Sequence, residues 1–406
     1  MYELTKQVRA LMNDNRRTYD GHQFTLPSPE LYPFQWLWDS CFHAIILSHF
    51  DLPAAKAELR SVCSHPLPNG LLPHIIYWGD DTAITNWGRE MRGNIITDAW
   101  GVEGTSAITQ PPIIAHALWR VYECDFDTAI LHDLYPVVSA YFDHLLTCRI
   151  DARTELAFII NPDESGEDNS PRFDTAQSLP PIHSADQNLD QRIARMHQNA
   201  TCNFEAQTCM AKHFAVVDVP FNVLLTDGLE HLARIATTLG NKRDATRYKT
   251  RARTLAEAMR QYINPETMYH SRNVRTGSTI SVDTWAMFMP LFGGFLSQQD
   301  AHELVQVHLL DTSRFWLRYP IPSTAQTEPS FDPHTGFWRG PVWMAPNWFI
   351  YHGLKRYGFH DTAEELRAKS VRLIERSGFR EQYNPLTGEG IGAHNFTWGG
   401  LVLDMK

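Results

Sequence analysis

The feature that most constrains the fold of this chain is a recurring pairing of two helical patterns, one with a broad apolar face and one with a narrow apolar stripe. In residues 240–263 apolar side chains recur at alternating steps of three and four, which predicts a surface helix. The preceding segment, 219–239, has a wider apolar face, so it predicts a more buried helix that stops at Gly240. The same alternation recurs at 107–122 against 127–149 and at 341–356 against 361–377, where Asp361 is the expected N-cap and Gly378 the expected stop.

Helix pairs of this kind follow one another at intervals of roughly 50 to 60 residues. Because each pair has one more apolar helix, two concentric rings of helices with the more apolar helices inside would bury the apolar faces. Strand patterns are short, at 157–160 and 268–269, and predict hairpin or loop pieces. We therefore expect an all-α fold in a single domain, 1–406, since no low-complexity linker interrupts the chain.

Composition excludes several classes of protein. The formal net charge is −10 and no dense run of Lys or Arg is present, which argues against a nucleic-acid partner. The N-terminus lacks the apolar region of a signal peptide and no apolar run is long enough to span a membrane, so we expect a cytoplasmic protein with no membrane partner. The six cysteines form no CxxC pair or zinc-spaced set. Reduced or inert thiols, no metal site and no cofactor are expected, and the sequence favours neither a monomer nor a homo-oligomer.

Three long segments carry the unusual residues: 161–205, 318–340 and 379–398. They are rich in Pro, Gly, Asn and acids and have little periodicity, which predicts loops. Loops of this length in a compact domain are usually functional.

The first of these segments concentrates acids in 161–174 (NPDESGEDNSPRFD). Carboxylates so close together must repel one another, bind a cation, or include one that stays protonated. A solvated acidic loop is an equally good interpretation, and calcium is a weaker one because the D-x-D-x-D-G ligand pattern is missing. The five carboxylates are Asp163, Glu164, Glu167, Asp168 and Asp174.

Two further groups have the chemistry of a sugar site. Glu381 stands beside the rigid corner Asn-Pro-Leu-Thr-Gly and supplies a second loop carboxylate, as glycosidic hydrolysis requires. Trp36, Trp38 and Asp39 cluster just before an apolar helix. An indole covers the C–H face of a sugar ring, and a carboxylate accepts hydrogen bonds from its hydroxyls. Taken alone, such a Trp pair is more often packing.

Five motifs occur in an order that resembles glycoside hydrolase family 63 and its trehalase-like relatives. The resemblance spans residues 31 to 398. The motifs are QWLWDS at 35–40, TQPP at 109–112, ESGEDNSPRF at 164–173, FWRGPVW at 337–343 with NW at 347–348, and YNPLTG at 383–388 with NFTW at 395–398.

The resemblance implies an (α/α)₆ toroidal barrel with its site at the mouth of the inner helices, and inverting hydrolysis of an α-linked sugar. By position, Asp168 is similar to the general acid of the family and Glu381 to its general base. Further residues are similar to those that bind substrate in the family: Tyr32, Trp36, Trp38, Asp39, Gln110, Arg339, Gly340 and Trp343.

The length of 406 residues suits a bare barrel, as in the mannosylglycerate and glucosylglycerate hydrolases of this family, and so favours a small saccharide or glycosyl-acid substrate. A glycerate carboxylate calls for an arginine, for which Arg172, Arg92 and Arg318 are candidates. Each of them is equally well explained as an ion-pair partner of the acidic loop, above all Arg172. The chain departs from the family where Asn-Pro-Asp precedes Glu164 in place of His-Pro-Trp, which leaves open which sugar stacks there.

Three alternatives remain open at the level of sequence. One is an α-glucosidase that acts on a disaccharide or oligosaccharide. Another is a sugar-binding barrel that has lost catalysis. The presence of both candidate carboxylates argues against this alternative. The third is a sugar epimerase, which would need paired histidines, whereas His74, His213 and His394 stand in unpaired loop contexts.

Overall fold

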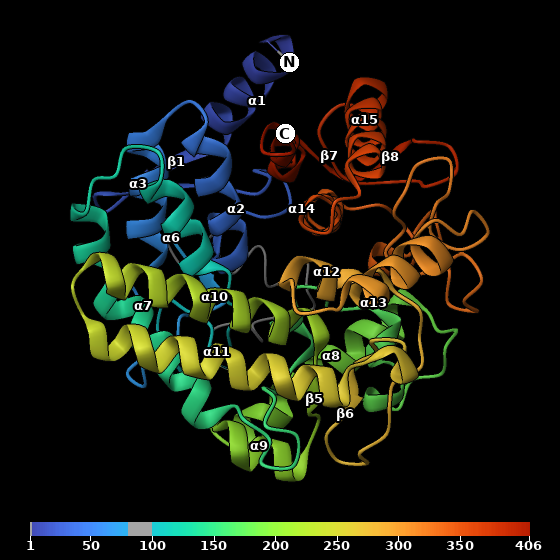
Figure 1. The fold of residues 1–406 in the computed structure, drawn as a ribbon, viewed down its shortest axis with the longest axis horizontal. Helices are drawn as coiled ribbons and strands as arrows, with labels where there is room; N and C mark the ends of the chain where they lie inside the picture. The colour runs from blue at the N-terminus through green and yellow to red at the C-terminus, as the bar shows by residue number, and fades with distance from the viewer. Residues whose placement is uncertain (1, 80–99) are drawn as a thin grey trace.

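The structure is a computed structural model that describes residues 2–79 and 100–406. Its elements are mostly helices (Figure 1), as the sequence predicts. The α-helices are α1 (Tyr2–Asn15), α2 (Leu37–Ser48), α3 (Leu52–Val62), α6 (Ile114–Tyr122), α7 (Ala129–Cys148), α8 (Ala185–Thr201), α9 (Ala206–Lys212), α10 (Val219–Thr238), α11 (Lys242–Tyr262), α12 (Met289–Gly293), α13 (Gln298–Glu303), α14 (Met344–Arg356) and α15 (His360–Ser377).

Short 3₁₀ segments, one π-helical segment and four two-stranded antiparallel sheets complete the described chain. The strands are β1 (Arg16–Tyr19) with β2 (His22–Thr25), β3 (Gln35–Trp36) with β4 (Ile75–Ile76), β5 (Val216–Val217) with β6 (Arg272–Asn273), and β7 (Arg380–Tyr383) with β8 (Gly390–His394). The 3₁₀ segments include η1 (Pro162–Ser165), η2 (Pro171–Phe173) and η8 (Thr397–Leu403), and the π-helix is η6 (Leu304–Leu309).

The helices form a closed ring of inner segments with outer partners. Among the described elements α2, α6, α10, α12, α14 and η8 pack successively, and η8 packs back onto α2. The outer helices α3, α7, α11, α15 and α1 lie against α2, α6, α10, α14 and η8 respectively. Figure 1 shows one such pair, α10 and α11, running side by side, and places the two termini near each other.

Burial distinguishes the two rings as the sequence pattern predicts. In α10 sixteen of its twenty residues are buried, whereas in α11 five of twenty-one are buried. Gly240 follows α10 with a φ of +77°, in the left-handed region that glycine favours at a helix end. Broad-face segments therefore line the barrel and narrow-stripe segments cover it.

Several boundaries differ from the prediction. The N-cap of α15 is Phe359, so Asp361 lies inside the first turn, where its charge still favours the helix dipole. Gly378 does end that helix, with a φ of +74°. Residues 268–269 form a turn, in agreement with a loop piece, and the strand β6 (Arg272–Asn273) follows them. Helices α6 and α14 begin several residues later than predicted because prolines precede both of them.

The prediction of a continuous loop over 161–205 is wrong, because this segment contains α8. This helix carries few apolar residues and so shows no broad stripe. The available signal was the capping box, in which the Ser184 hydroxyl accepts from the Gln187 N–H and the Gln187 side chain accepts from the Ser184 N–H.

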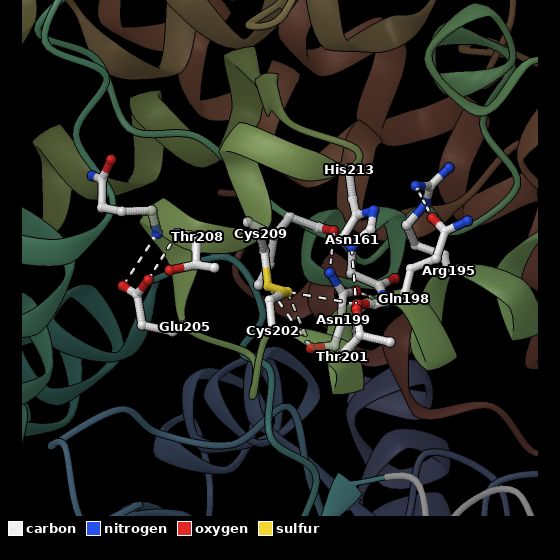
Figure 2. The surroundings of a disulfide bond; sticks show 12 residues. Asn161, Arg195, Gln198, Asn199, Thr201, Cys202, Glu205, Thr208, Cys209 and His213 are labelled. Atoms are coloured by element: carbon white, nitrogen blue, oxygen red, sulfur yellow. Dashed lines mark hydrogen bonds between the residues drawn. A yellow bond between two sulfur atoms is a disulfide. The ribbon is translucent and has the colours of Figure 1, made fainter.

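The prediction of reduced thiols is also wrong for one pair, since Cys202 and Cys209 form a disulfide between the end of α8 and α9 (Figure 2). The chain reverses between them, with positive φ at Asn203 and Phe204, and this brings together two cysteines seven positions apart. Disulfides are rare in reducing compartments, so this bond does not support the cytoplasmic location expected from the sequence. None of the described helices has the length and apolar character needed to cross a membrane.

Candidate active site

A cavity of about 370 Å³ opens where the inner helices begin. Trp36 and Trp343 are the N-cap residues of α2 and α14, and Gln110 lies just ahead of α6. The loop after η1 and the β7–β8 hairpin close the other sides with Asp168 and Glu381. The two carboxyl groups predicted to carry the chemistry, 213 positions apart in the sequence, therefore line one cavity.

Most of the predicted binding residues line this cavity as well, and three do not. Those that line it are Tyr32, Trp36, Trp38, Asp39, Gln110 and Trp343. Arg172, Arg339 and Gly340 are absent from its lining. The Arg172 guanidinium is buried in ion pairs with Glu167 (2.6 Å) and Asp218 (3.0 Å), and Arg339 holds Asp174 through two hydrogen bonds of 3.0 and 2.8 Å.

Gly340 has a structural role, since its N–H donates to the Ser323 hydroxyl at 2.9 Å and its backbone passes close to Asp332. Arg318 lies over the Tyr319 ring, 5.6 Å from the centroid, and does not line the cavity either. Arg92 lies outside the described residues.

Glu381 is held by two donors. The Tyr32 hydroxyl donates to Oε1 and the Ala393 N–H of β8 donates to Oε2 at 2.8 Å. Burial raises the pKa of the Glu381 carboxyl, and these two donors oppose the rise because they stabilise the ionised form. The position that faces the Glu381 carboxylate on β8 requires a glycine. At Gly392, which has a φ of +69°, a Cβ would collide with this carboxylate.

Asp168 faces a different partner. Its Oδ2 lies 2.6 Å from the Nη2 of Arg192, a residue of α8 that also bonds Asp163 at 3.0 Å through Nε. Burial raises the pKa of the Asp168 carboxyl, and the Arg192 charge opposes that rise. The preceding Gly166 has a φ of +72° and passes so close to the Trp38 indole that no Cβ would fit, which fixes the loop against the aromatic side of the cavity.

Arg192 is the residue that the sequence reasoning missed. Among the described residues that line the cavity it alone is a lysine or arginine. Sequence patterns do not single it out, because α8 lacks an apolar stripe that would show which of its residues face the cavity.

Ion pairing with arginines, as between Asp168 and Arg192, explains the whole acidic segment, 161–174. Each of its five carboxylates meets an arginine: Arg172 belongs to the segment itself, and the other arginines come from outside it. Arg192 pairs with Asp163 and Asp168, Arg149 with Glu164 (2.8 and 2.6 Å), Arg172 with Glu167, and Arg339 with Asp174.

An aromatic wall forms one side of the cavity. We define it as Trp36, Trp38, Trp338, Trp343, Phe396 and Trp398, all of which line the cavity. Trp338 and Trp343 stack with centroids 4.0 Å apart and planes within 2°. The Trp398 indole meets Trp38 edge-on at 5.1 Å and donates from Nε1 to Asp39 at 2.8 Å. Burial raises the pKa of Asp39 to about 6. Apolar faces and a hydrogen-bonding carboxyl stand side by side, as a sugar ring requires.

The three histidines considered from the sequence, His74, His213 and His394, do not form the pair in the cavity that an epimerase would use. His74 lines the cavity and its Nδ1 lies 2.7 Å from the Ser106 hydroxyl, while His213 and His394 are not in the lining. Burial lowers the pKa of His74 to about 4, which keeps the ring neutral near pH 7.

Known proteins match this chain over nearly its full length. Residues 32–399 match the family described as the mannosylglycerate hydrolase MGH1-like glycoside hydrolase domain. A mannosylglycerate hydrolase of Thermus thermophilus is 33% identical over 98% of both chains. The glucosylglycerate hydrolase of Mycolicibacterium hassiacum is 28% identical over 99% of this chain and 97% of its own.

Solved structures give the same result. The crystal structure of a family 63 mannosylglycerate hydrolase from Thermus thermophilus in complex with Tris and D-glycerate has a TM-score of 0.86, with 32% identity and 99% of both chains covered. Neutral trehalase Nth1 from Saccharomyces cerevisiae, 13% identical over 98% of this chain and 80% of its own, has a TM-score of 0.65 and shows a shared fold. The predicted (α/α)₆ barrel is confirmed. The chain belongs to the MGH1-like domain family of glycoside hydrolase family 63, and it is a glycoside hydrolase.

Proposed function

We propose that this enzyme hydrolyses a small α-glycoside of glyceric acid, such as mannosylglycerate or glucosylglycerate, with inversion at the anomeric carbon. The observation that carries the proposal is one cavity that holds two candidate catalytic carboxyl groups, an aromatic wall and a single lining arginine among its described residues. The names of the full-length relatives, mannosylglycerate and glucosylglycerate hydrolase, support the same substrate class.

In this proposal Asp168 is the general acid and Glu381 the general base. An inverting enzyme keeps about 6.5–9.5 Å between its two carboxyl groups, which leaves room for a water molecule. Glu381 suits the base because the Tyr32 hydroxyl and the Ala393 N–H stabilise its ionised form. Glu381 takes a proton from water as the water attacks the anomeric carbon, and Asp168 gives its proton to the departing glycosidic oxygen.

The aromatic wall would cover an apolar face of the sugar, and Asp39 would accept from its hydroxyls. The Trp398 indole orients the Asp39 carboxyl at 2.8 Å, so the acceptor is placed before substrate arrives. Gln110 is oriented likewise, because its Oε1 accepts from the Trp38 N–H at 3.1 Å. These contacts would set the position of the ring relative to Asp168 and Glu381.

Arg192 would bind the glycerate carboxylate. Guanidinium and carboxylate pair through charge-assisted hydrogen bonds, and Arg192 lies beside the acid that protonates the leaving group. An anionic aglycone at this place would also share Arg192 with Asp168. Because the Arg192 charge lowers the pKa of Asp168, such sharing favours the protonated acid at the moment it is needed.

The test combines a substrate screen with two matched variants. Released sugar is measured with mannosylglycerate, glucosylglycerate, their neutral glycerol counterparts and α-linked disaccharides. Asp168→Asn should lower kcat roughly 10²–10⁴-fold, the usual contribution of a general acid, while sugar binding stays measurable. Asp163→Asn is the control, since Asp163 also lines the cavity and pairs with Arg192.

The control variant should keep kcat within roughly a factor of ten. Near-normal turnover by Asp168→Asn would remove Asp168 from the acid role. Preference for a disaccharide over both glycerates would instead favour an α-glucosidase, and sugar binding without turnover on any substrate would favour a binding protein.

A further inference from the structure

Three side chains of metal-ligating type meet between the inner helices α6 and α10, outside the cavity. His116 comes from α6, and Asp227 and His231 come from α10. One ligand atom of each lies within 4.8 Å of the ligand atoms of the other two. None of the three lines the proposed active site.

The spacing of these atoms is close to that of a coordinated set. Asp227 Oδ2 lies 2.9 Å from His116 Nδ1 and 3.2 Å from His231 Nδ1. In a tetrahedral zinc site with bonds of about 2.0–2.1 Å, neighbouring ligand atoms stand roughly 3.3 Å apart. Small side-chain rotations that move the ligand atoms by a few tenths of an ångström would bring Asp227 and each histidine to that spacing.

The backbone presents the three groups in a fixed arrangement. Asp227 and His231 are four positions apart, so both project from one face of α10. α6 packs directly against α10 in the inner ring and supplies His116 from the facing side. Ligands on two packed helices lose little freedom when they bind an ion.

The surroundings suit a bound cation that can still be reached from outside. The Phe292 and Trp348 rings flank His116, with centroids 5.7 and 5.9 Å away, and form an apolar shell. The side chain of His116 is 12% exposed, which leaves a path for an ion. Two arginine charges act on the cluster: Arg120, which is paired with Asp404 at 2.7 Å, acts on His116, and Arg234 acts on His231.

We propose that His116, Asp227 and His231 form a Zn²⁺ site that cross-links α6 to α10. Two imidazoles and one carboxylate are donors that zinc prefers, and three protein ligands leave the fourth position to water. The ion replaces the contacts that the Asp227 carboxylate makes with the two histidines, and His231 Nδ1 exchanges its 2.8 Å contact with the Asp227 carbonyl oxygen for the metal. This site is separate from the glycosidase chemistry, so the inference does not depend on the proposed function.

The test measures metal uptake by the full chain without a polyhistidine tag. Protein stripped with chelator is dialysed against Zn²⁺ alone, and bound metal per chain is measured by elemental analysis. A parallel sample takes up Co²⁺ alone, whose visible absorption reports tetrahedral coordination. Variants His116→Gln and His231→Gln remove one ligand each, and Asp227→Asn serves if either fails to fold. His352→Gln is the matched control, a histidine on another inner helix, α14, whose Nε2 bonds Asp404 at 3.0 Å.

The expected result is about one Zn²⁺ per chain in the native protein and in His352→Gln, and none in the ligand variants. Zn²⁺ should also raise Tm in proportion to the logarithm of its concentration, because the folded chain alone holds the site. Native protein that takes up no stoichiometric Zn²⁺ overturns the proposal. Equal uptake by the native protein and the ligand variants overturns it as well, because the ion would then bind elsewhere.

Discussion

Arg192 lies next to the proposed acid and is, among the described lining residues, the cavity's one lysine or arginine. Its charge lowers the pKa of Asp168 against the effect of burial. The same guanidinium lies within 3.0 Å of Asp163, so it separates two carboxylates that would otherwise repel. Two effects on catalysis follow, one on substrate choice and one on pH.

Arg192→Gln should therefore change activity in two ways. The kcat/KM for glycosylglycerates should fall roughly ten- to a hundredfold, the equivalent of a charged hydrogen bond of about 1.5–3 kcal/mol, while neutral glycerol analogues lose much less. Without the cation the pKa of Asp168 rises, so the acid keeps its proton to higher pH. The alkaline limb of kcat/KM for neutral substrates should then move to higher pH. Steady-state kinetics from pH 5 to 9 checks both, and an unmoved limb would contradict the proposed pairing.

At the scale of elements, α8 shows what local sequence patterns leave out. The paired inner and outer helices were predictable because a helix that buries one whole face has apolar residues at a regular spacing in its sequence. α8 covers the cavity with Leu189, Arg192, Ile193 and Met196, and its other buried residues are the polar Asn188, Arg195 and Asn199, so its buried face is too mixed to show an apolar stripe. Its capping box marked the start, and its end is secured by the disulfide from Cys202.

Removing this disulfide should loosen α8 without touching the catalytic pair. Closing so short a loop is worth roughly 2–3 kcal/mol in the chain-entropy description. Cys202→Ser with Cys209→Ser should raise hydrogen exchange at the end of α8 and raise KM for glycosylglycerates, because Arg192 is on this helix. The value of kcat should change less, since Asp168 and Glu381 lie on other segments. Cys124→Ser, at an exposed free thiol, is the control. Unchanged exchange and KM in the double variant would show that the disulfide does not position α8.

At the scale of the whole molecule, Asp404 joins segments that are distant along the chain. Its carboxylate accepts from Arg120 at 2.7 Å, Trp348 at 2.9 Å, and His49 and His352 at 3.0 Å each. These partners belong to or follow α2, α6 and α14, so one side chain after η8 links four inner segments where the ring closes. The pKa of Asp404 is lowered well below its usual value despite burial, because all four partners favour the ionised form.

The sign of the resulting pH effect follows from this lowered pKa. The stabilisation is fully present above the pKa of an unfolded aspartate, about 3.9, and is lost as pH falls below it towards the folded value. Asp404→Asn should lower the free energy of unfolding by roughly 2–3 kcal/mol at pH 7. In urea titrations the difference between the two proteins should shrink below about pH 4. A difference that stays constant down to pH 3 would contradict this account.

The whole barrel was easier to predict than its ion pairs. The order of five motifs identified the family. Six of the eight predicted binding residues other than Arg172 line the cavity, since residues at the starts of inner helices converge there. Arg339 and Gly340 belong to the same motif as Trp343 but do not line the cavity, because the Arg339 guanidinium bonds Asp174 and the Gly340 N–H donates to the Ser323 hydroxyl. The pairing of each arginine with its carboxylate depends on long-range packing, so it cannot be predicted from the spacing of these residues in the sequence.

The proposed reaction is tested most directly by the anomer of sugar released in the first turnovers. Proton NMR of the native enzyme with an α-glycosylglycerate distinguishes the two anomers before they equilibrate in water. The account predicts that the β-anomer appears first, because a water activated by Glu381 attacks from the face opposite to the departing oxygen. Initial release of the α-anomer would mean that configuration is retained, and the assignment of Asp168 and Glu381 as an inverting pair would be contradicted.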